Sequence, residues 1–148
     1  MYLKKGKNIM NIDSIKDGFV IDHIPAGKGM EIYKKLNLNK LNCQVAIITN
    51  AKSQKTDKKD IIKIDKNIDI NIDILGFINP DITINIVKND KIVKKFHPEP
   101  PQELVNVVQC QNPRCITSVE KDLDQIFVLT DKENQVYRCK YCEMSLKN

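Results

Sequence analysis

Four cysteines in the C-terminal third of the chain restrict its fold more than any other feature. Cys110 and Cys115 form one close pair, and Cys139 and Cys142 form a second pair after 23 intervening residues. A tetrahedral Zn²⁺ ion needs two such pairs, each on a tight turn, with an insert that folds the second pair back onto the first. Pro113 helps to bend the first turn. The spacing therefore predicts one structural zinc ion, Zn2+, whose four ligand positions are all filled by cysteine.

Other uses of these cysteines fit the sequence less well. Two disulfides would be typical of a small secreted chain, and nothing in this sequence indicates secretion. A redox pair of the Cys-x-x-Cys type would need a tryptophan-glycine context and a βαβ surround, which are absent. The fifth cysteine, Cys43, is predicted to be a buried apolar thiol in a strand. His97 is predicted to be a surface residue, because four cysteines complete the zinc shell.

The composition predicts a cytoplasmic protein with a core made mostly of isoleucine. Apolar residues make up 41% of the 148 residues and aromatic residues only 5%. The sequence contains no apolar run of 18 residues, so we expect no membrane span. Its basic start has no hydrophobic region of a signal peptide behind it, and residues 1–9 are expected to form a loose tail.

The net charge of +5 is unevenly distributed. Residues 1–98 hold 18 lysines and 11 acidic residues, a net +7, and residues 99–148 hold 6 basic and 8 acidic residues, a net −2. The zinc-bearing part is therefore mildly acidic, which argues against a nucleic-acid-binding role for that part.

Residues 1–98 contain a series of short apolar and alternating stretches. Residues 52–58 are polar and rich in lysine, and we expect them to form a loop. We predict strands over residues 10–15, 19–24, 43–49, 60–65, 81–87 and 91–96, and a helix over residues 26–38.

Residues 68–78 are ambiguous between strand and helix. Ile68, Ile70, Ile72 and Ile74 alternate with polar residues, which favours a strand, but Ile68, Ile72, Leu75 and Ile78 also fit one helical face. A helix here gives the order strand–helix–strand–strand–helix–strand, which is the ferredoxin-like (split βαβ) topology. We therefore predict an α+β fold with an antiparallel sheet and two helices.

Residues 98–101 form a proline-rich linker that separates two predicted domains, 1–98 and 99–148. Beyond the linker, residues 104–108 lead into the first cysteine pair, and a hairpin of residues 125–130 and 135–138 delivers the second. We expect a small all-β zinc domain. Fifty residues bury little apolar surface, so zinc must supply much of the folding free energy, of the order of 10 kcal/mol.

The chain resembles the regulatory chain of aspartate carbamoyltransferase over residues 10–145. Several separate motifs occur in the right order, which makes the resemblance more specific than the cysteine spacing. The segments that carry it are Val20 to Ala26, Lys58 to Ile64, Pro80 to Asn85, Asn106 to Cys110 and Cys139 to Glu143.

The resemblance implies a non-catalytic subunit of pyrimidine biosynthesis. Its N-terminal domain would bind CTP and UTP as inhibitors and ATP as an activator, and would pair with a second regulatory chain. Its zinc domain would contact the catalytic chain, in an assembly of two catalytic trimers and three regulatory dimers. The nucleotide contacts implied by the resemblance are Ile12, Asp13, Ser14, Ile15, Val20, Asp22, His23, Lys59, Lys63, Asn85, Val87, Ile92 and Lys95.

The residues themselves leave two interpretations open for this set. Lys59 and Lys63 are four positions apart on one strand and share a face, which fits either a solvated lysine-rich strand or a phosphate cradle. Asp22 and His23 are adjacent on a strand, so we expect their side chains on opposite faces. Asn85 offers a donor and an acceptor for a base or ribose. The family often has an aromatic residue where this chain has Asp90, whose carboxylate would weaken polyphosphate binding unless it faces solvent or Mg²⁺.

Two other function classes fit the sequence less well than the regulatory one. A zinc-ribbon nucleic-acid-binding protein is permitted by the total charge, but the zinc region is acidic and stacking aromatics are scarce. A metalloenzyme or thiol oxidoreductase is disfavoured by the presence of only two histidines and the lack of a His–Glu helix motif. We therefore expect no nucleic acid among the partners and no catalytic residues.

Overall fold

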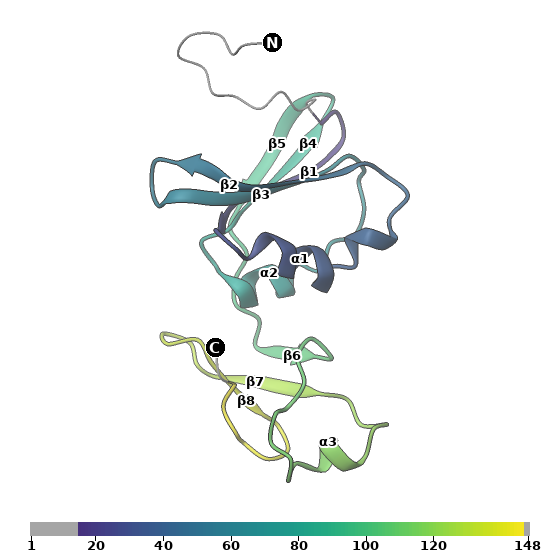
Figure 1. Ribbon diagram of the computed structural model, residues 1–148, viewed down its shortest axis with the longest axis vertical. Helices are drawn as coiled ribbons and strands as arrows, with labels where there is room; N and C mark the ends of the chain where they lie inside the picture. Colours follow the sequence, from purple (N-terminus) through teal and green to yellow (C-terminus); the bar gives the residue numbers. More distant parts are fainter. Residues whose placement is uncertain (1–14, 147–148) are drawn as a thin grey trace.

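The computed structural model describes residues 15–146, whose strands form two separate sheets (Figure 1). The first sheet has five strands in the order β2-β3-β1-β4-β5, and the second has three in the order β6-β7-β8. The first sheet and the helices beside it contain β1 (Gly18–Pro25), α1 (Gly29–Lys35), η1 (Leu38–Lys40), β2 (Val45–Ser53), β3 (Asp57–Ile64), α2 (Ile72–Ile78), β4 (Thr83–Lys88) and β5 (Lys91–Phe96). The second part contains β6 (Glu103–Val105), α3 (Ile116–Val119), β7 (Ile126–Asp131) and β8 (Val136–Cys139).

The predicted ferredoxin-like order is confirmed by the first sheet. Every neighbouring strand pair is antiparallel, and β3 lies between β1 and β2 while β1 lies between β3 and β4. These interleaved crossovers are the split βαβ arrangement. Both helices cover the same face of the sheet, and they lie between it and the second part of the chain (Figure 1).

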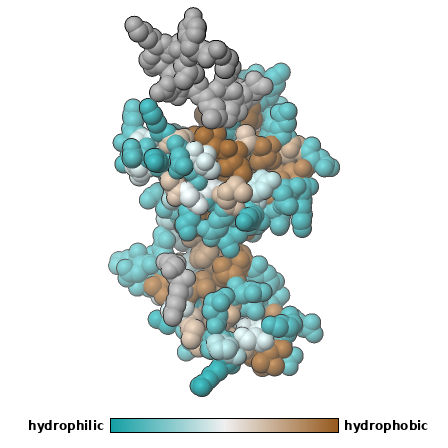
Figure 2. Space-filling model, in the orientation of Figure 1, coloured by the Kyte–Doolittle hydropathy of each residue, from teal (hydrophilic) through white to brown (hydrophobic). Residues whose placement is uncertain are grey.

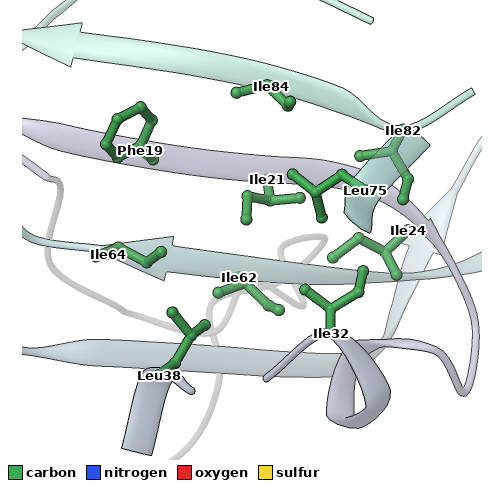
Figure 3. Close-up of a cluster of buried hydrophobic side chains, with 10 residues drawn as sticks. All are labelled: Phe19, Ile21, Ile24, Ile32, Leu38, Ile62, Ile64, Leu75, Ile82 and Ile84. Atoms are coloured by element: carbon green, nitrogen blue, oxygen red, sulfur yellow. The ribbon is translucent and has the colours of Figure 1, made fainter. Parts of the chain in front are cut away.

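The core between sheet and helices is built mostly from isoleucine, as the composition predicts (Figure 3). The side chains of β1, β3 and β4 that point toward the helices are buried, including Ile21, Ile62 and Ile84. Ile32 of α1 and Leu75 of α2 close this layer and are also fully buried. Each such side chain contributes roughly 1.5–3 kcal/mol by leaving water, so this layer holds the N-terminal part together.

The ambiguous segment 68–78 is irregular in its first part and helical in its second part. Residues 68–71 are not helical, and Ile68 and Ile70 pack against the core as partly buried side chains. The helix begins only at Ile72 and buries Ile74, Leu75 and Gly76. The predicted helix therefore exists but is shorter than the predicted range.

Three other predicted ranges need correction. The helix predicted over 26–38 covers only Gly29–Lys35, because Gly27 has a φ of +94° before it and Asn37 a φ of +54° after it. The loop predicted over 52–58 covers only residues 54–56, because β2 extends to Ser53 and β3 begins at Asp57, with Lys52 opposite Lys58. The ends of these strands extend beyond the core, where both faces of the sheet meet water. Their sequence therefore lacks the apolar alternation from which a strand is predicted. The strand predicted over 43–49 begins at Val45.

The zinc-bearing part is a three-stranded antiparallel sheet with one short helix. The predicted hairpin is β7 and β8, and the stretch predicted to lead into the first cysteine pair contributes β6. The one-turn helix α3 after Cys115 was not predicted. Within residues 15–146, no helix is long and apolar enough to cross a membrane. The strand predicted over residues 10–15 lies almost entirely outside the described residues.

Helix α2 is the element that meets the linker and the second part of the chain. Gly76 faces the carbonyl of Glu99 so closely that a methyl group there would overlap its oxygen and carbon atoms. The next residue, Phe77, packs edge to face on Tyr137 of β8, with ring centroids 5.3 Å apart. Tyr137 in turn donates its hydroxyl proton to the carbonyl oxygen of Pro101 at 2.7 Å.

Replacement of Gly76 by alanine tests this close approach. Alanine favours helix over glycine by about 1 kcal/mol, so without the Glu99 contact Gly76→Ala would stabilise the protein. We expect the opposite sign, a loss of roughly 1–3 kcal/mol in the free energy of unfolding, because the linker must move. Urea denaturation followed by circular dichroism measures this change. Ile72→Ala, at the exposed start of the same helix, is the control and should change stability far less; a stabilised Gly76→Ala variant would contradict the packing.

Candidate functional site

The four predicted zinc ligands come together at one end of the second sheet. Cys110 and Cys115 lie on the turn before α3, and Cys139 and Cys142 lie on the turn that ends β8. Their four sulfur atoms all lie within 4.8 Å of one another. The β7–β8 hairpin thus returns the second pair to the first, as the 23-residue spacing predicts.

The sulfur separations fit zinc and not disulfides. The Sγ atoms are 3.6 Å apart in Cys110 and Cys142, and 3.7 Å apart in Cys115 and Cys139. Four Zn–S bonds of about 2.3 Å in a tetrahedron place sulfur atoms roughly 3.8 Å apart, whereas a disulfide would bring them to about 2.0 Å. All five cysteines, which lie within the described residues, are unbridged.

Each turn is fixed by backbone hydrogen bonds around its cysteines. In the first turn, the N–H of Cys115 donates to the carbonyl of Asn112 at 3.0 Å. In the second turn, the N–H of Glu143 donates to the carbonyl of Cys139 at 2.8 Å, with Glu143 at a φ of +65°. The side chain of Gln125 accepts a hydrogen bond from the N–H of Cys110 at 3.0 Å. These bonds hold the sulfur positions from outside the cluster, as second-shell contacts do in metal sites.

The surroundings divide the four thiols into two kinds. Burial raises the pKa of the Cys110 thiol to about 12, and burial likewise raises the pKa of Cys139. A hydrogen bond from the Asn112 side chain lowers the pKa of Cys142 to about 6. Burial opposes ionisation of Cys115, but hydrogen bonds from the Thr117 hydroxyl and N–H outweigh it and lower its pKa. A divalent cation stabilises all four thiolates, which offsets the cost of burying Cys110 and Cys139.

Two polar residues of this site were missed in the sequence. Thr117 is 1% exposed and donates its hydroxyl proton to the sulfur of Cys115 at 3.1 Å. Asn112, inside the first cysteine pair, contacts the sulfur of Cys142. Threonine close to a ligand and asparagine in a turn are both common in proteins, so neither residue alone indicated a contact with a ligand sulfur atom.

The second set of predicted residues lies on the face of the first sheet that the helices leave open. Strand register places Lys63, Val20, Asn85 and Lys95 in one row across β3, β1, β4 and β5. The side chain of Asn85 donates to the carbonyl of Val20 at 3.2 Å, which fixes its amide within this row. Val87 and Ile92 form a neighbouring pair on β4 and β5. Ile15 is buried, and Ile12, Asp13 and Ser14 lie outside the described residues.

Asp22 and His23 do not alternate as predicted, because the strand bulges between Ile21 and Ile24. His23 has a φ of +56°, and its Nδ1 atom lies 3.0 Å from the hydroxyl of Thr83, the residue opposite Asp22. The expectation that the two side chains point to opposite faces is therefore wrong. The bulge instead brings His23 to the edge of the open face.

Lys59 is already paired on this face. Its Nζ atom lies 2.9 Å from a carboxylate oxygen of Asp22, and both side chains are mostly buried, with 17% and 24% of their surface exposed. Lys63 is partly buried on the same side of β3, since Asp60, Ile62 and Ile64 face the core. Asp90 is exposed in the β4–β5 turn, so its carboxylate faces solvent.

Loss of one sulfur ligand tests the metal site. We expect wild-type protein to hold one zinc ion per chain, and Cys115→Ser to lose it together with the folded structure of residues 102–146. The reason is that zinc supplies of the order of 10 kcal/mol to such small domains. Metal analysis and amide NMR spectra measure the two effects. Cys43→Ser is the matched control, because Cys43 lies outside the cluster; if this control also lost zinc, or Cys115→Ser kept it, the site would be misassigned.

Comparison with known proteins identifies the family of both parts of the chain. The family described as "Aspartate carbamoyltransferase regulatory chain, allosteric domain" matches residues 10–99, and "Aspartate carbamoyltransferase regulatory chain, metal binding domain" matches residues 102–148. The metal-binding family and the four-cysteine cluster together support a single structural zinc ion.

Curated relatives carry the same description over most of their length. The aspartate carbamoyltransferase regulatory chain of Clostridium tetani is 51% identical over 136 residues, which cover 91% of this chain and 94% of the relative. That of Clostridium botulinum (strain Hall) is 50% identical over 135 residues, covering 91% and 92%. That of Bifidobacterium longum is 40% identical over 138 residues, covering 93% and 99%. The chain therefore belongs to the family of aspartate carbamoyltransferase regulatory chains, as a non-catalytic subunit with an allosteric and a metal-binding domain.

Proposed function

We propose that the open face of the five-stranded sheet binds the nucleotides that control aspartate carbamoyltransferase. CTP, assisted by UTP, inhibits in this proposal, and ATP activates. The observation that carries it is the row of Lys63, Val20, Asn85 and Lys95 across four strands. Two ammonium groups for phosphates, an amide for a base or ribose edge and an apolar wall are the groups that a nucleotide requires.

The Asp22–Lys59 ion pair would bind the ribose of the nucleotide rather than its phosphates. A lysine paired with a carboxylate contributes little net charge toward a phosphate. The carboxylate of Asp22 can accept hydrogen bonds from ribose hydroxyl groups while Lys59 neutralises it. The family resemblance supplies the remaining proposed contacts, which are Ile12, Asp13, Ser14, Ile15, His23, Val87 and Ile92.

We further propose a division of labour along the chain. Residues 1–98 form the nucleotide-binding domain and pair with a second regulatory chain, and residues 99–148 form the zinc domain that contacts the catalytic chain. Two catalytic trimers and three such regulatory dimers make up the cytoplasmic assembly. Zinc has no chemistry to perform here, because four cysteines leave no open position for water or substrate.

Exposed apolar residues next to the zinc ligands support the docking role. Ile116 and Val119 of α3 directly follow Cys115 and are 48% and 71% exposed. Tyr141 lies between the last two ligands and Met144 follows them, at 41% and 43%. Figure 2 shows hydrophobic residues at the surface over α3. Apolar side chains gathered in this way are typical of protein contacts.

Calorimetric titration of the zinc-loaded chain with CTP and with ATP tests the nucleotide site. We expect saturable binding that weakens roughly tenfold or more in Lys63→Ala, because a charge-assisted hydrogen bond to phosphate is lost. Lys59→Ala should also weaken binding, because it leaves the Asp22 carboxylate without its ion-pair partner on the nucleotide face.

Lys40→Ala serves as the matched control, because Lys40 is an exposed lysine in η1, an element beside the opposite, helix-covered face. Its removal subtracts the same charge and should leave both affinities unchanged. Equal binding by wild type, Lys59→Ala and Lys63→Ala would place the nucleotide elsewhere. A complete lack of binding heat would mean that the chain does not respond to nucleotides.

Mixing the chain with catalytic trimers tests the docking role. Zinc removal should abolish the complex, because the segments that carry Ile116, Val119 and Tyr141 are held by the zinc ligands. Val119→Glu should retain its zinc ion but weaken association, since it places a charge in an apolar contact. Gel filtration of the mixture, with metal analysis of each peak, measures both effects. A zinc-free chain that still assembled would refute this role for the metal.

A further inference from the structure

Asp60 of β3 is a buried acidic residue that neither the zinc site nor the nucleotide row uses. It is 0% exposed and lies on the core face of β3, on the same side as Ile62 and Ile64. Within residues 15–146, no lysine or arginine forms an ion pair with its carboxylate. The burial of an ionised carboxylate costs free energy, so a residue of this kind in an isoleucine core requires an explanation.

The carboxylate of Asp60 is held by backbone N–H groups from two other parts of the sheet. Its Oδ1 atom accepts a hydrogen bond from the N–H of Asn50 in β2 at 3.0 Å. Its Oδ2 atom accepts bonds from the N–H groups of Gly27 and Gly29, in the turn after β1 and at the start of α1, at 3.0 and 2.9 Å. Hydrogen bonds to an ionised acceptor are stronger than those between neutral groups. Asp60 therefore ties β2, β3 and the turn after β1 together at one point.

Both strands beside β3 carry a bulge at the level of Asp60. The bulge of β1 lies directly before Ile24, the residue opposite Asp60, and the bulge of β2 contains Asn50. His23 in the first bulge and Asn50 in the second have φ angles of +56° and +58°. Left-handed backbone is unfavourable for residues other than glycine and persists only where surrounding contacts fix it. The hydrogen bonds to Asp60 are contacts of this kind.

The bulge of β1 determines where two of the proposed nucleotide contacts lie. Asp22 and His23 are the two residues inside it, and Asp22 forms its ion pair with Lys59, the residue before Asp60. Gly27, which Asp60 holds, follows His23 by four residues, so the anchored turn restricts the position of the end of β1. Asp60 thus acts on these contacts through the backbone, from the core side of the sheet.

We propose that Asp60 is a positioning residue of the nucleotide site. Its carboxylate holds the two bulges beside β3 in their geometry before a nucleotide arrives, so that His23 and the Asp22–Lys59 pair present their polar atoms together. This inference rests on the proposed nucleotide function and adds to it a residue that does not touch the nucleotide. Groups that are fixed in advance bind more tightly, because less conformational freedom is lost on binding.

Two variants disturb this anchor from different elements. Asp60→Asn keeps the size of the side chain but offers one acceptor oxygen to donors on two sides, so an N–H group on one side meets an NH₂ group. Gly29→Ala keeps the carboxylate, but its methyl group would lie 2.9 Å from the Oδ2 atom of Asp60 and displace it. Ile62→Val shortens the neighbouring buried side chain of β3 and is the matched control for a loss of stability.

Histidine NMR and calorimetry with CTP, both on the full, zinc-loaded chain, measure the effect. The chain has two histidines, and single substitutions assign their ring signals. In both variants we expect the His23 signals to shift without any nucleotide. The signals of His97, whose Nδ1 atom lies 2.9 Å from the carbonyl oxygen of Ile82, should stay in place. CTP should bind roughly tenfold more weakly, because only a fraction of the molecules then has the binding geometry.

Ile62→Val should leave the His23 signals and the CTP affinity unchanged, although urea denaturation shows a loss of stability. Wild-type affinity together with unmoved His23 signals in both variants would overturn the proposal. An equal loss of affinity in Ile62→Val would also overturn it, because general destabilisation would then be the cause. Should Asp60→Asn fail to fold, Gly29→Ala decides in the same way. If the wild-type chain binds no CTP, the proposed nucleotide function fails, and the His23 signals still decide whether Asp60 sets the geometry of the bulge.

Discussion

The structure depends most on the packing of helix α2 between its two sheets. The helix buries Leu75 in the isoleucine core and packs Ile78 against it, while Gly76 and Phe77 meet the linker and the zinc-bearing part. The absence of a side chain at Gly76 lets the Glu99 carbonyl approach the helix, and Phe77 then reaches Tyr137. Burial, followed by the nearby Asp73 carboxylate, raises the pKa of Tyr137 to about 12, so its hydroxyl remains a donor to Pro101. A seven-residue helix is too short to be stable alone, so these tertiary contacts hold it in place.

The two parts of the chain reach stability by different routes. The first buries a layer of ten apolar side chains, seven of them isoleucine. The second has six buried residues in its core cluster, and two of these, Cys115 and Cys139, are zinc ligands. Its metal site and its apolar core therefore share residues. A metal that holds the turns also fixes the exposed side chains on them, so folding and surface presentation depend on one set of sulfur atoms.

The sequence predicted most reliably the features that rest on a strict pattern. The cysteine spacing led to the complete metal-ligand set, and alternation identified the strands of both sheets that carry a buried face. The predictions that failed concern features that apolar alternation does not encode. The bulge at His23 reversed the face predicted for its side chain, and the lysines of the β2–β3 hairpin concealed a strand pair. Asp60 shares parity with Ile62 and Ile64 and is buried with them, but the sequence did not predict its role, because its three backbone donors, Gly27, Gly29 and Asn50, belong to other segments of the chain.

The position of the open face restricts how any ligand on it can influence a partner. Both helices and the zinc-bearing part lie on the other side of the sheet, so a nucleotide on the row of Lys63 and Asn85 does not touch them directly (Figure 1). Its influence must pass through strands whose inner side chains pack on α1 and α2. Among residues 15–146, the contacts that link α1 and α2 to the linker and the zinc-bearing part include Phe77 on Tyr137, Gly76 on Glu99, and a 3.5 Å hydrogen bond from Lys35 to the carbonyl of Val107. A coupling free energy of about 1–3 kcal/mol, which is typical of allosteric systems, is comparable to the energy of one or two such contacts. A regulatory chain can therefore transmit its signal by a small change in how α2 sits against the linker, with neither core rearranged.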